Sequence, residues 1–139
     1  MIQIIAGEKG KGKTKHLIEK ANADIKQAKG NIVYLDKSDK HMYELNNKIR
    51  LINVVDYGIE SSDGFLGFIS GIISQDHDLD TMFLDSFLKL AHLEGKDITD
   101  TIDKLEKISE TFHIVFVLSV SMDEKFLPDN AKSKVLISL

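Results

Sequence analysis

The sequence contains no cysteine, one proline and one arginine, and each shortage narrows what the chain can be. Without thiols it can form neither disulfides nor thiolate metal sites, so we expect a reducing compartment. The low content of glycine and proline and the absence of low-complexity segments argue against disorder. No apolar stretch approaches the roughly 20 residues of a membrane-spanning helix. Because the strand-like start also carries no basic leader, we expect a cytoplasmic protein.

Size and charge restrict the class of protein further. A length of 139 residues with 42% hydrophobic content fits a single domain over residues 1–139 with one core. The net charge of −4 disfavours a general nucleic-acid coat, so nucleic acid is not indicated as a partner. Four lysines nevertheless crowd into one short stretch: Lys9, Lys11, Lys13 and Lys15. This local cluster is the natural place for an anion to bind.

Apolar runs alternate with helical periodicity along the whole chain. The strand candidates are residues 2–6, 31–35, 51–55, 81–84, 114–118 and 135–137. Helices are expected after Lys13, around residues 42–45, after residues 61–63, over residues 87–93 and after Asp97. This alternation predicts an α/β fold with three layers, α-β-α, and a mainly parallel sheet of about five strands. In such folds ligands bind at the carboxyl ends of the strands.

The helix expected after residues 61–63 contains two glycines, Gly67 and Gly71, four residues apart among bulky apolar side chains. Such spacing leaves a groove along one face of the helix, through which its backbone could approach the sheet closely.

The segment Gly7–Thr14 reads GEKGKGKT and matches the P-loop pattern G-x-x-x-x-G-K-[ST] at every position. An apolar run leads into it and a helical pattern leads out, which is the context that the motif requires. Its glycines let backbone N–H groups turn toward phosphates, and the helix that follows directs its positive end at them. We therefore expect a nucleoside triphosphate to bind here, with ATP as the default and Mg²⁺ as its companion.

Within this motif the residues have different expected roles. Lys13 should bridge the terminal phosphates, and the Thr14 hydroxyl should coordinate Mg²⁺. The other residues expected at the nucleotide are Gly7, Glu8, Lys9, Gly10, Lys11, Gly12 and Lys15. For Lys9 and Lys11, contact with the triphosphate and projection into solvent both stay open. A glycine-rich turn that binds nothing is the alternative for the whole motif, but it would leave Lys13 unpaired at the positive end of a helix.

A second metal ligand is expected from an acidic residue at the end of a nearby strand. Asp85 follows residues 81–84 and is our choice for this Walker B position, where it would hold Mg²⁺. The alternative is that Asp85 only caps the following helix.

The catalytic candidate is Asp36, which follows residues 31–35 and could orient or deprotonate an attacking water. Its alternative role is to open a turn with residues 37–39. Asp56 is a weaker candidate of the same kind. Ser119 and Ser121 could reach the terminal phosphate, or they could be ordinary hydroxyls at the end of a strand.

Together these residues resemble the P-loop NTPase superfamily, and the segment Phe83–Ser86 resembles the hydrophobic-Asp-Ser Walker B strand of its RecA-like (ASCE) branch. The resemblance implies a P-loop NTPase fold in which the strand ending in Ser119 lies between the two motif strands. It also implies that Asp36 takes the position that family members often give to a catalytic glutamate. The whole chain is similar to small Firmicutes ATP-binding proteins of unassigned role, some of them labelled as twitching-motility or pilus-retraction ATPases.

We therefore expect a Mg-ATP-binding protein that acts as a nucleotide-dependent switch or a slow ATPase. Hydrolysis is the weak point because Arg50 is the only arginine available to stabilise transition-state charge. A homo-oligomer or a larger partner protein could supply the missing charge. Two alternatives stay open, namely a small-molecule or nucleotide kinase, which would need an arginine-rich lid and an acceptor pocket, and a non-catalytic ATP-binding partner module.

Overall fold

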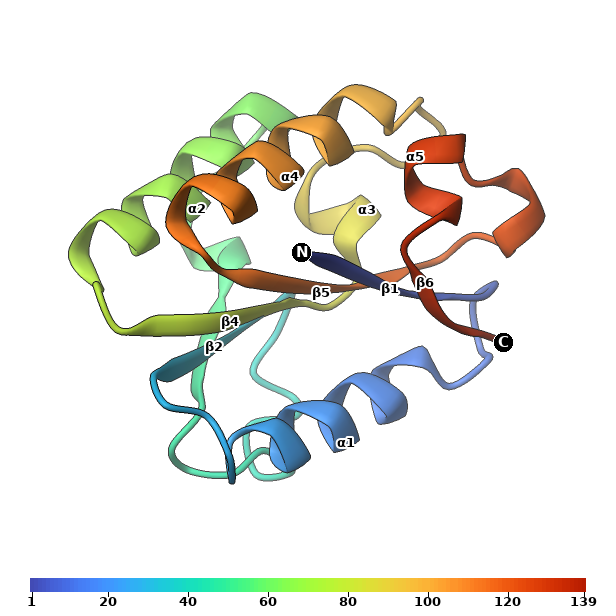
Figure 1. The fold of residues 1–139 in the computed structure, drawn as a ribbon. Helices are drawn as coiled ribbons and strands as arrows, with labels where there is room; N and C mark the ends of the chain where they lie inside the picture. Colours follow the sequence, from blue (N-terminus) through green and yellow to red (C-terminus); the bar gives the residue numbers. More distant parts are fainter.

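A six-stranded parallel sheet forms the middle of the protein in the computed structural model, which describes all residues from Met1 to Leu139 (Figure 1). The strands are β1 (Ile2–Ala6), β2 (Asn31–Asp36), β3 (Arg50–Asn53), β4 (Leu79–Leu84), β5 (Val115–Val120) and β6 (Val135–Ser138). They lie in the order β3-β2-β4-β5-β1-β6, and every pairing is parallel. The expected three-layer α/β fold is confirmed, with six strands in place of about five.

Helices cover the two faces of the sheet unequally (Figure 1). On one face lies α1 (Lys13–Asp24) alone. The other face carries α2 (Ser62–Gln75), α3 (Phe87–Leu90), α4 (Thr99–Phe112) and α5 (Asp129–Lys132). The larger core cluster, of 28 buried residues, lies under these four helices, whereas the cluster under α1 has 10. None of the helices combines the length and hydropathy that crossing a bilayer requires.

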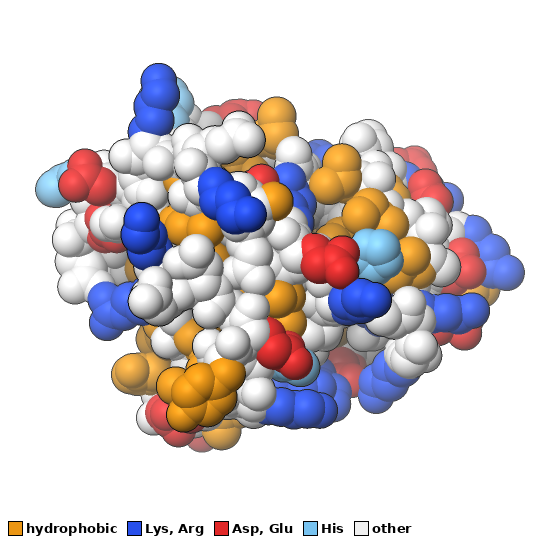
Figure 2. Space-filling model, turned by 90° about the horizontal axis from the view of Figure 1, so that it is seen from below, with side chains coloured by type: hydrophobic (Ala, Val, Ile, Leu, Met, Phe, Trp, Pro, Cys, Tyr) orange, Lys and Arg blue, Asp and Glu red, His pale blue; other side chains and the backbone are white.

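The α1 face is completed by the segment that follows β2. Residues 40–45 form turns, so the short helix expected around residues 42–45 is absent. Leu45 and Ile49 are nevertheless buried in the same cluster as Leu17 and Tyr34, and they anchor the segment beside α1. On the surface of this face, basic, acidic and apolar side chains are interspersed (Figure 2).

The order of the strands determines which residues can meet at the carboxyl edge of the sheet. Strand β5 lies between β1 and β4, with Ile4 beside Leu118 and Phe83 beside Val117. The expected place of this strand between the two motif strands is confirmed. Because all strands point the same way, the residues at the ends of β1, β5, β4 and β2 are neighbours along one edge.

The end of one expected strand needs correction. The strand expected over residues 51–55 ends at Asn53, because the Asn53 side chain accepts a hydrogen bond from the Val55 N–H and starts a short 3₁₀ helix, η1 (Val54–Tyr57). A second short 3₁₀ helix, η2 (Glu124–Phe126), precedes α5.

The glycine face of α2 does not approach the sheet, so that expectation was wrong. Gly67 and Gly71 are exposed, and a Cβ built at either would meet no atom within 4 Å. Helix α2 turns Phe65, Ile69 and Ile72 toward the core instead. Burial of these bulky side chains outweighs any gain from close backbone approach, and it rotates the glycines into solvent.

Substituting Gly67→Ala or Gly71→Ala should therefore stabilise the protein. Each change should raise the free energy of unfolding by about 0.5–1 kcal/mol, because alanine loses less backbone entropy in a helix than glycine does. Urea denaturation measures the change. Gly30→Ala is the contrasting variant and should destabilise, since its Cβ would lie 2.0 Å from the Asp78 carbonyl oxygen. A loss of stability in both α2 variants would contradict the solvent position of this helix face.

Candidate functional site

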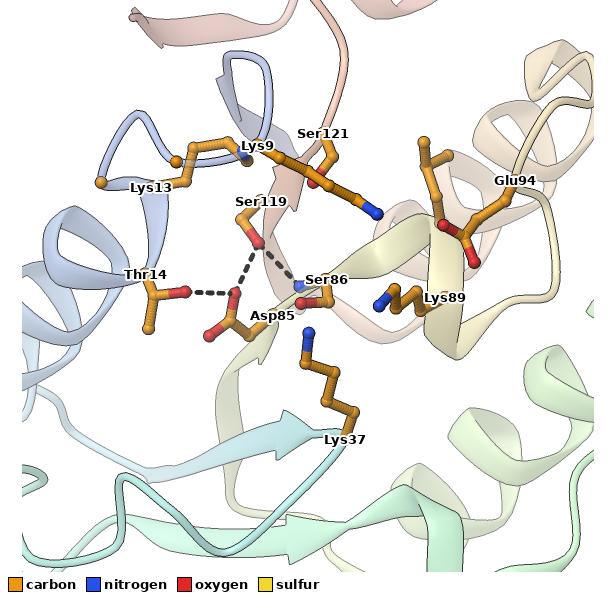
Figure 3. Close-up of a pocket in the computed structure, with 13 residues that line it drawn as sticks. Lys9, Lys13, Thr14, Lys37, Asp85, Ser86, Lys89, Glu94, Ser119 and Ser121 are labelled. Atoms are coloured by element: carbon orange, nitrogen blue, oxygen red, sulfur yellow. Dashed lines mark hydrogen bonds between the residues drawn. The ribbon is translucent and has the colours of Figure 1, made fainter.

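A polar cavity of about 310 Å³ lies at the carboxyl edge of the sheet (Figure 3). It is lined by Lys9, Gly10, Gly12, Lys13, Thr14, Lys37, Asp85, Ser86, Leu88, Lys89, Glu94, Ser119 and Ser121. Only one of these side chains is hydrophobic. Four lysines face two carboxylates, so the lining carries net positive charge when all six groups are ionised. A cavity of this kind suits an anion.

The loop Gly7–Thr14 shapes one wall of this cavity. Gly10 and Gly12 have φ angles of 82° and 87°, a left-handed conformation that residues with a side chain rarely adopt. Gly12 is also the N-cap of α1, and no side chain accepts a hydrogen bond at that end of the helix. The first N–H groups of α1 therefore have no side-chain acceptor, and they remain available to an anion.

Gly7, at the base of the loop, lies close to another segment of the chain. A Cβ at this position would lie 3.0 Å from the Cβ of Leu139, the last residue of the chain. The Leu139 N–H donates to the Ala6 carbonyl, and this bond holds the end of the chain against the loop. A larger residue at position 7 would therefore push the two segments apart.

Lys13 is the buried cation of the cavity, with 8% of its surface exposed. Its Nζ donates one hydrogen bond, of 3.0 Å, to the Glu8 carbonyl oxygen. Burial lowers the pKa of the Lys13 ammonium, the charge of Asp85 opposes this shift, and Lys9 lowers the pKa further. An ammonium has three donors, so two remain free for a ligand.

Asp85 is the polar centre of the site and is almost fully buried. Its Oδ1 accepts from the hydroxyls of Thr14 at 3.2 Å and Ser119 at 2.7 Å, and its Oδ2 accepts from Tyr34 at 2.9 Å. The Ser119 hydroxyl in turn accepts from the Ser86 N–H (Figure 3). Burial, followed by the charge of Asp85, raises the pKa of the Tyr34 phenol, which stays a donor. Asp85 thus accepts hydroxyls and does not cap α3, whose N-cap is Ser86.

The residues present fit a magnesium ion. Octahedral Mg²⁺ holds its ligands at about 2.1 Å, which places adjacent oxygens about 2.9 Å apart. The Thr14 and Asp85 oxygens are 3.2 Å apart, so a small shift lets both face one cation. No group of three or more His, Cys, Asp or Glu side chains is placed to hold a metal. The remaining ligands would therefore be water and oxygens of a bound anion, as Mg²⁺ prefers.

Asp36 ends β2 directly beside Asp85, since the Asp85 N–H donates to the Leu35 carbonyl. Its carboxylate is buried; Oδ1 accepts from the Lys37 N–H at 2.7 Å, and Oδ2 has no partner. Burial and then the charge of Asp85 raise the pKa of Asp36. The side chain does not line the cavity, so the structure brings Asp36 next to Asp85 but not into the same space.

Several other sequence candidates lie outside the cavity. Glu8, Lys11 and Lys15 belong to the loop or to α1 but do not line it, and Asp56 and Arg50 are exposed near the end and the start of β3. Lys9, Ser119 and Ser121 do line it. Strand β5 continues to Val120, so Ser119 belongs to the strand itself.

The sequence interpretation missed four polar residues of the site, Tyr34, Lys37, Lys89 and Glu94. Lys37 directly follows a candidate strand-end aspartate, and Lys89 lies three residues after Ser86. These positions near strand ends were a usable signal, because parallel strands gather them at one edge. Tyr34 lies within a continuous apolar run and gives no comparable signal.

A second cavity, of about 420 Å³, opens between α1 and the segment after β2. It is lined by Thr14, Lys15, Ile18, Glu19, His41 and Glu44. Asn22 of α1 bonds the Glu44 carbonyl at 2.9 Å and the Asn46 N–H at 2.7 Å, which fixes the two walls to each other. Thr14, near the start of α1, borders both cavities.

The three layers, the parallel sheet and the loop between β1 and α1 define a P-loop-like α/β fold. The structure is similar to that of the flagellar accessory protein FlaH from Methanocaldococcus jannaschii, with a TM-score of 0.59 and 15% sequence identity. The similarity covers 95% of this chain but only 65% of FlaH. At this identity the similarity shows the fold alone. No protein-family model matches the sequence, and no curated protein matches it either.

Replacing Asp36 should change how stability depends on pH. The pKa of Asp36 is raised in the folded protein. At pH values between the ordinary pKa and the raised pKa, the folded state therefore still holds a proton that the unfolded chain has released. Stability contributed by this group is therefore lost as pH rises through that window. Asp36→Asn should be more stable than wild type at pH 7, and the difference should shrink toward pH ~4.

Denaturant titrations at several pH values measure this difference. Asp56→Asn, which changes an exposed aspartate, is the control and should follow the wild-type curve at all pH values. An Asp36→Asn curve parallel to wild type would show that burial does not perturb Asp36.

Proposed function

We propose that this protein binds Mg-ATP through the loop Gly7–Thr14 and works as a nucleotide-dependent switch or slow ATPase. One observation carries the proposal: Thr14 of the loop contacts the buried Asp85 across 71 residues of sequence, inside a cationic cavity. A glycine-rich turn that binds nothing would not explain why a complete motif lies against the buried carboxylate of Asp85.

The phosphates would lie in the cavity against the start of α1. Unoccupied backbone donors there, the two free donors of Lys13 and the positive lining all favour a polyanion. Mg-ATP carries net negative charge, so it complements the excess of lysines over carboxylates in the lining.

The metal would be held by Thr14 and, directly or through water, by Asp85. When bound, Mg²⁺ supplies charge neutralisation and orients the phosphate oxygens. Asp85 keeps Tyr34 and Ser119 as donors in that arrangement, so the carboxylate stays fixed while Thr14 turns its hydroxyl to the cation.

The second cavity offers room for the nucleoside. It begins at Thr14 and Lys15, where a chain of phosphates lying against the start of α1 would end. Ile18 provides an apolar wall for a base, and the carboxylates of Glu19 and Glu44 can accept from exocyclic amino groups. Adenine and guanine both carry such a group, so these carboxylates do not select between ATP and GTP. ATP therefore remains the default nucleotide.

Turnover would depend on Asp36, whose free Oδ2 and raised pKa suit a residue that accepts a proton from water. Its place beside the cavity means that water must enter, or the end of β2 must move, before the carboxylate acts. Arg50 lies at the edge strand and is not part of the cavity. Both features favour slow hydrolysis.

Transfer of the phosphoryl group to a small acceptor is the second candidate, and one observation favours it. A smaller cavity of about 190 Å³ adjoins the first and shares Lys37 and Lys89 with it. Its other lining residues are Val54, Val55, Ile59, Leu90 and His92. ADP formation that requires an added metabolite and releases no inorganic phosphate would favour this kinase, and binding without any ADP formation would favour a non-catalytic module.

Lys13→Ala should weaken Mg-ATP binding by about 100-fold, which is the loss expected when one buried charged hydrogen-bond donor is removed. Calorimetric titration with Mg-ATP measures it. Lys26→Ala, an exposed lysine beyond the end of α1, is the control and should bind as wild type does. Equal affinity in Lys13→Ala and wild type, or no binding by wild type, would refute the proposal.

The purified monomer should hydrolyse ATP more slowly than about 1 s⁻¹, the low end of typical enzyme rates. Asp36→Asn should lower kcat by about 100-fold, the usual contribution of a general base, and leave the Kd for Mg-ATP unchanged. A phosphate-release assay gives the rate, with Asp56→Asn as control. Rapid turnover by a monomer, or full activity in Asp36→Asn, would contradict this role.

A further inference from the structure

Two lysines that belong to no part of the loop motif reach the cavity from the other strands. Lys37 is the first residue after β2, and Lys89 lies in α3, which follows β4. Figure 3 shows both side chains pointing toward Ser86, whereas Thr14 approaches Asp85 from the side of α1. The cavity is therefore lined by cations on two opposite sides.

Neither lysine has a counter-ion. The ion pairs of the protein involve other residues, and no hydrogen bond is donated by either Nζ. The two carboxylates that line the cavity, Asp85 and Glu94, form an ion pair with neither lysine, and the Asp85 oxygens already accept three hydroxyls. Like charges that converge on one space repel each other, so an anion there removes a repulsion as well as making new bonds.

The part of the nucleotide that these lysines would meet follows from the proposed function, on which this inference rests. Lys13 and the first N–H groups of α1 hold the phosphates from the loop side. The opposite side of the cavity is then left for the terminal phosphoryl group, which carries the most negative charge. Arg50 lies at the far edge of the sheet and cannot reach it.

We propose that Lys37 and Lys89 form a second anion subsite that binds the terminal phosphoryl group of the nucleotide. They supply, from within one chain, cationic charge that the scarcity of arginine would otherwise require from a neighbour. Their function is the same whether the phosphoryl group goes to water or to an acceptor, because both transition states place charge on its oxygens. The subsite also makes the protein distinguish a triphosphate from a diphosphate.

The test compares two nucleotides in lysine variants. Lys37→Met and Lys89→Met keep an unbranched side chain of similar length and remove its charge. Each should weaken the binding of a non-hydrolysable ATP analogue by about tenfold and that of ADP by less than about twofold, as expected for a partly solvated charged hydrogen bond. Lys40→Met and Lys96→Met are matched controls, because they remove the same charge from exposed positions close in sequence to Lys37 and Lys89 but outside the cavity.

Three results would overturn the inference in distinguishable ways. If both variants bind the analogue as tightly as wild type does, and wild type binds both nucleotides, the lysine subsite is overturned but the proposed function is not. Equal weakening for the analogue and ADP shows that the lysines act through general charge, and it also overturns the subsite. Wild type that binds neither nucleotide overturns the proposed function as well. Lys37→Arg and Lys89→Arg keep the charge and should retain the preference for the analogue, which separates lost charge from a folding defect.

Discussion

The site depends on the hydrogen bonds that the buried carboxylate of Asp85 accepts. A carboxylate removed from water is stable only if donors replace the water, and Asp85 has three hydroxyl donors from three different elements. Thr14 comes from α1, Tyr34 from β2 and Ser119 from β5. The requirement for these donors fixes the start of α1 against the carboxyl edge of the sheet. Of the three bonds, the one from Thr14 is the longest, so it is the easiest for a ligand to replace.

The parts of the site that the sequence predicted are those set by local order. The loop motif is continuous in sequence, and two of its glycines, Gly10 and Gly12, adopt left-handed angles. Asp85 and Asp36 were identified because each directly follows an apolar strand pattern in the sequence. The position of β5 between β1 and β4 came from the family resemblance alone, because no pattern within one strand says which strand lies beside it.

The parts that were missed depend on register between distant segments. Tyr34 lies in a strand buried on both faces, so its apolar neighbours gave no sign that its hydroxyl donates to Asp85. Lys37 and Lys89 resemble ordinary surface lysines until the sheet brings the ends of β2 and β4 together. The prediction that Gly67 and Gly71 face the sheet was wrong, because the spacing of small residues does not tell which face of a helix is buried. In α2 the bulky residues decided that question.

The unequal layers connect the site to the stability of the fold. Four helices bury the larger core on one face, whereas α1 is held by the smaller cluster and by polar contacts at each end. These contacts are Thr14 with Asp85, and Asn22 with Glu44 and Asn46. A ligand that bridges the loop and Asp85 adds to the weaker layer, and ligand binding stabilises whichever state it selects. Occupancy would therefore tighten α1 against the sheet more than it changes the other face, which is the behaviour a switch needs.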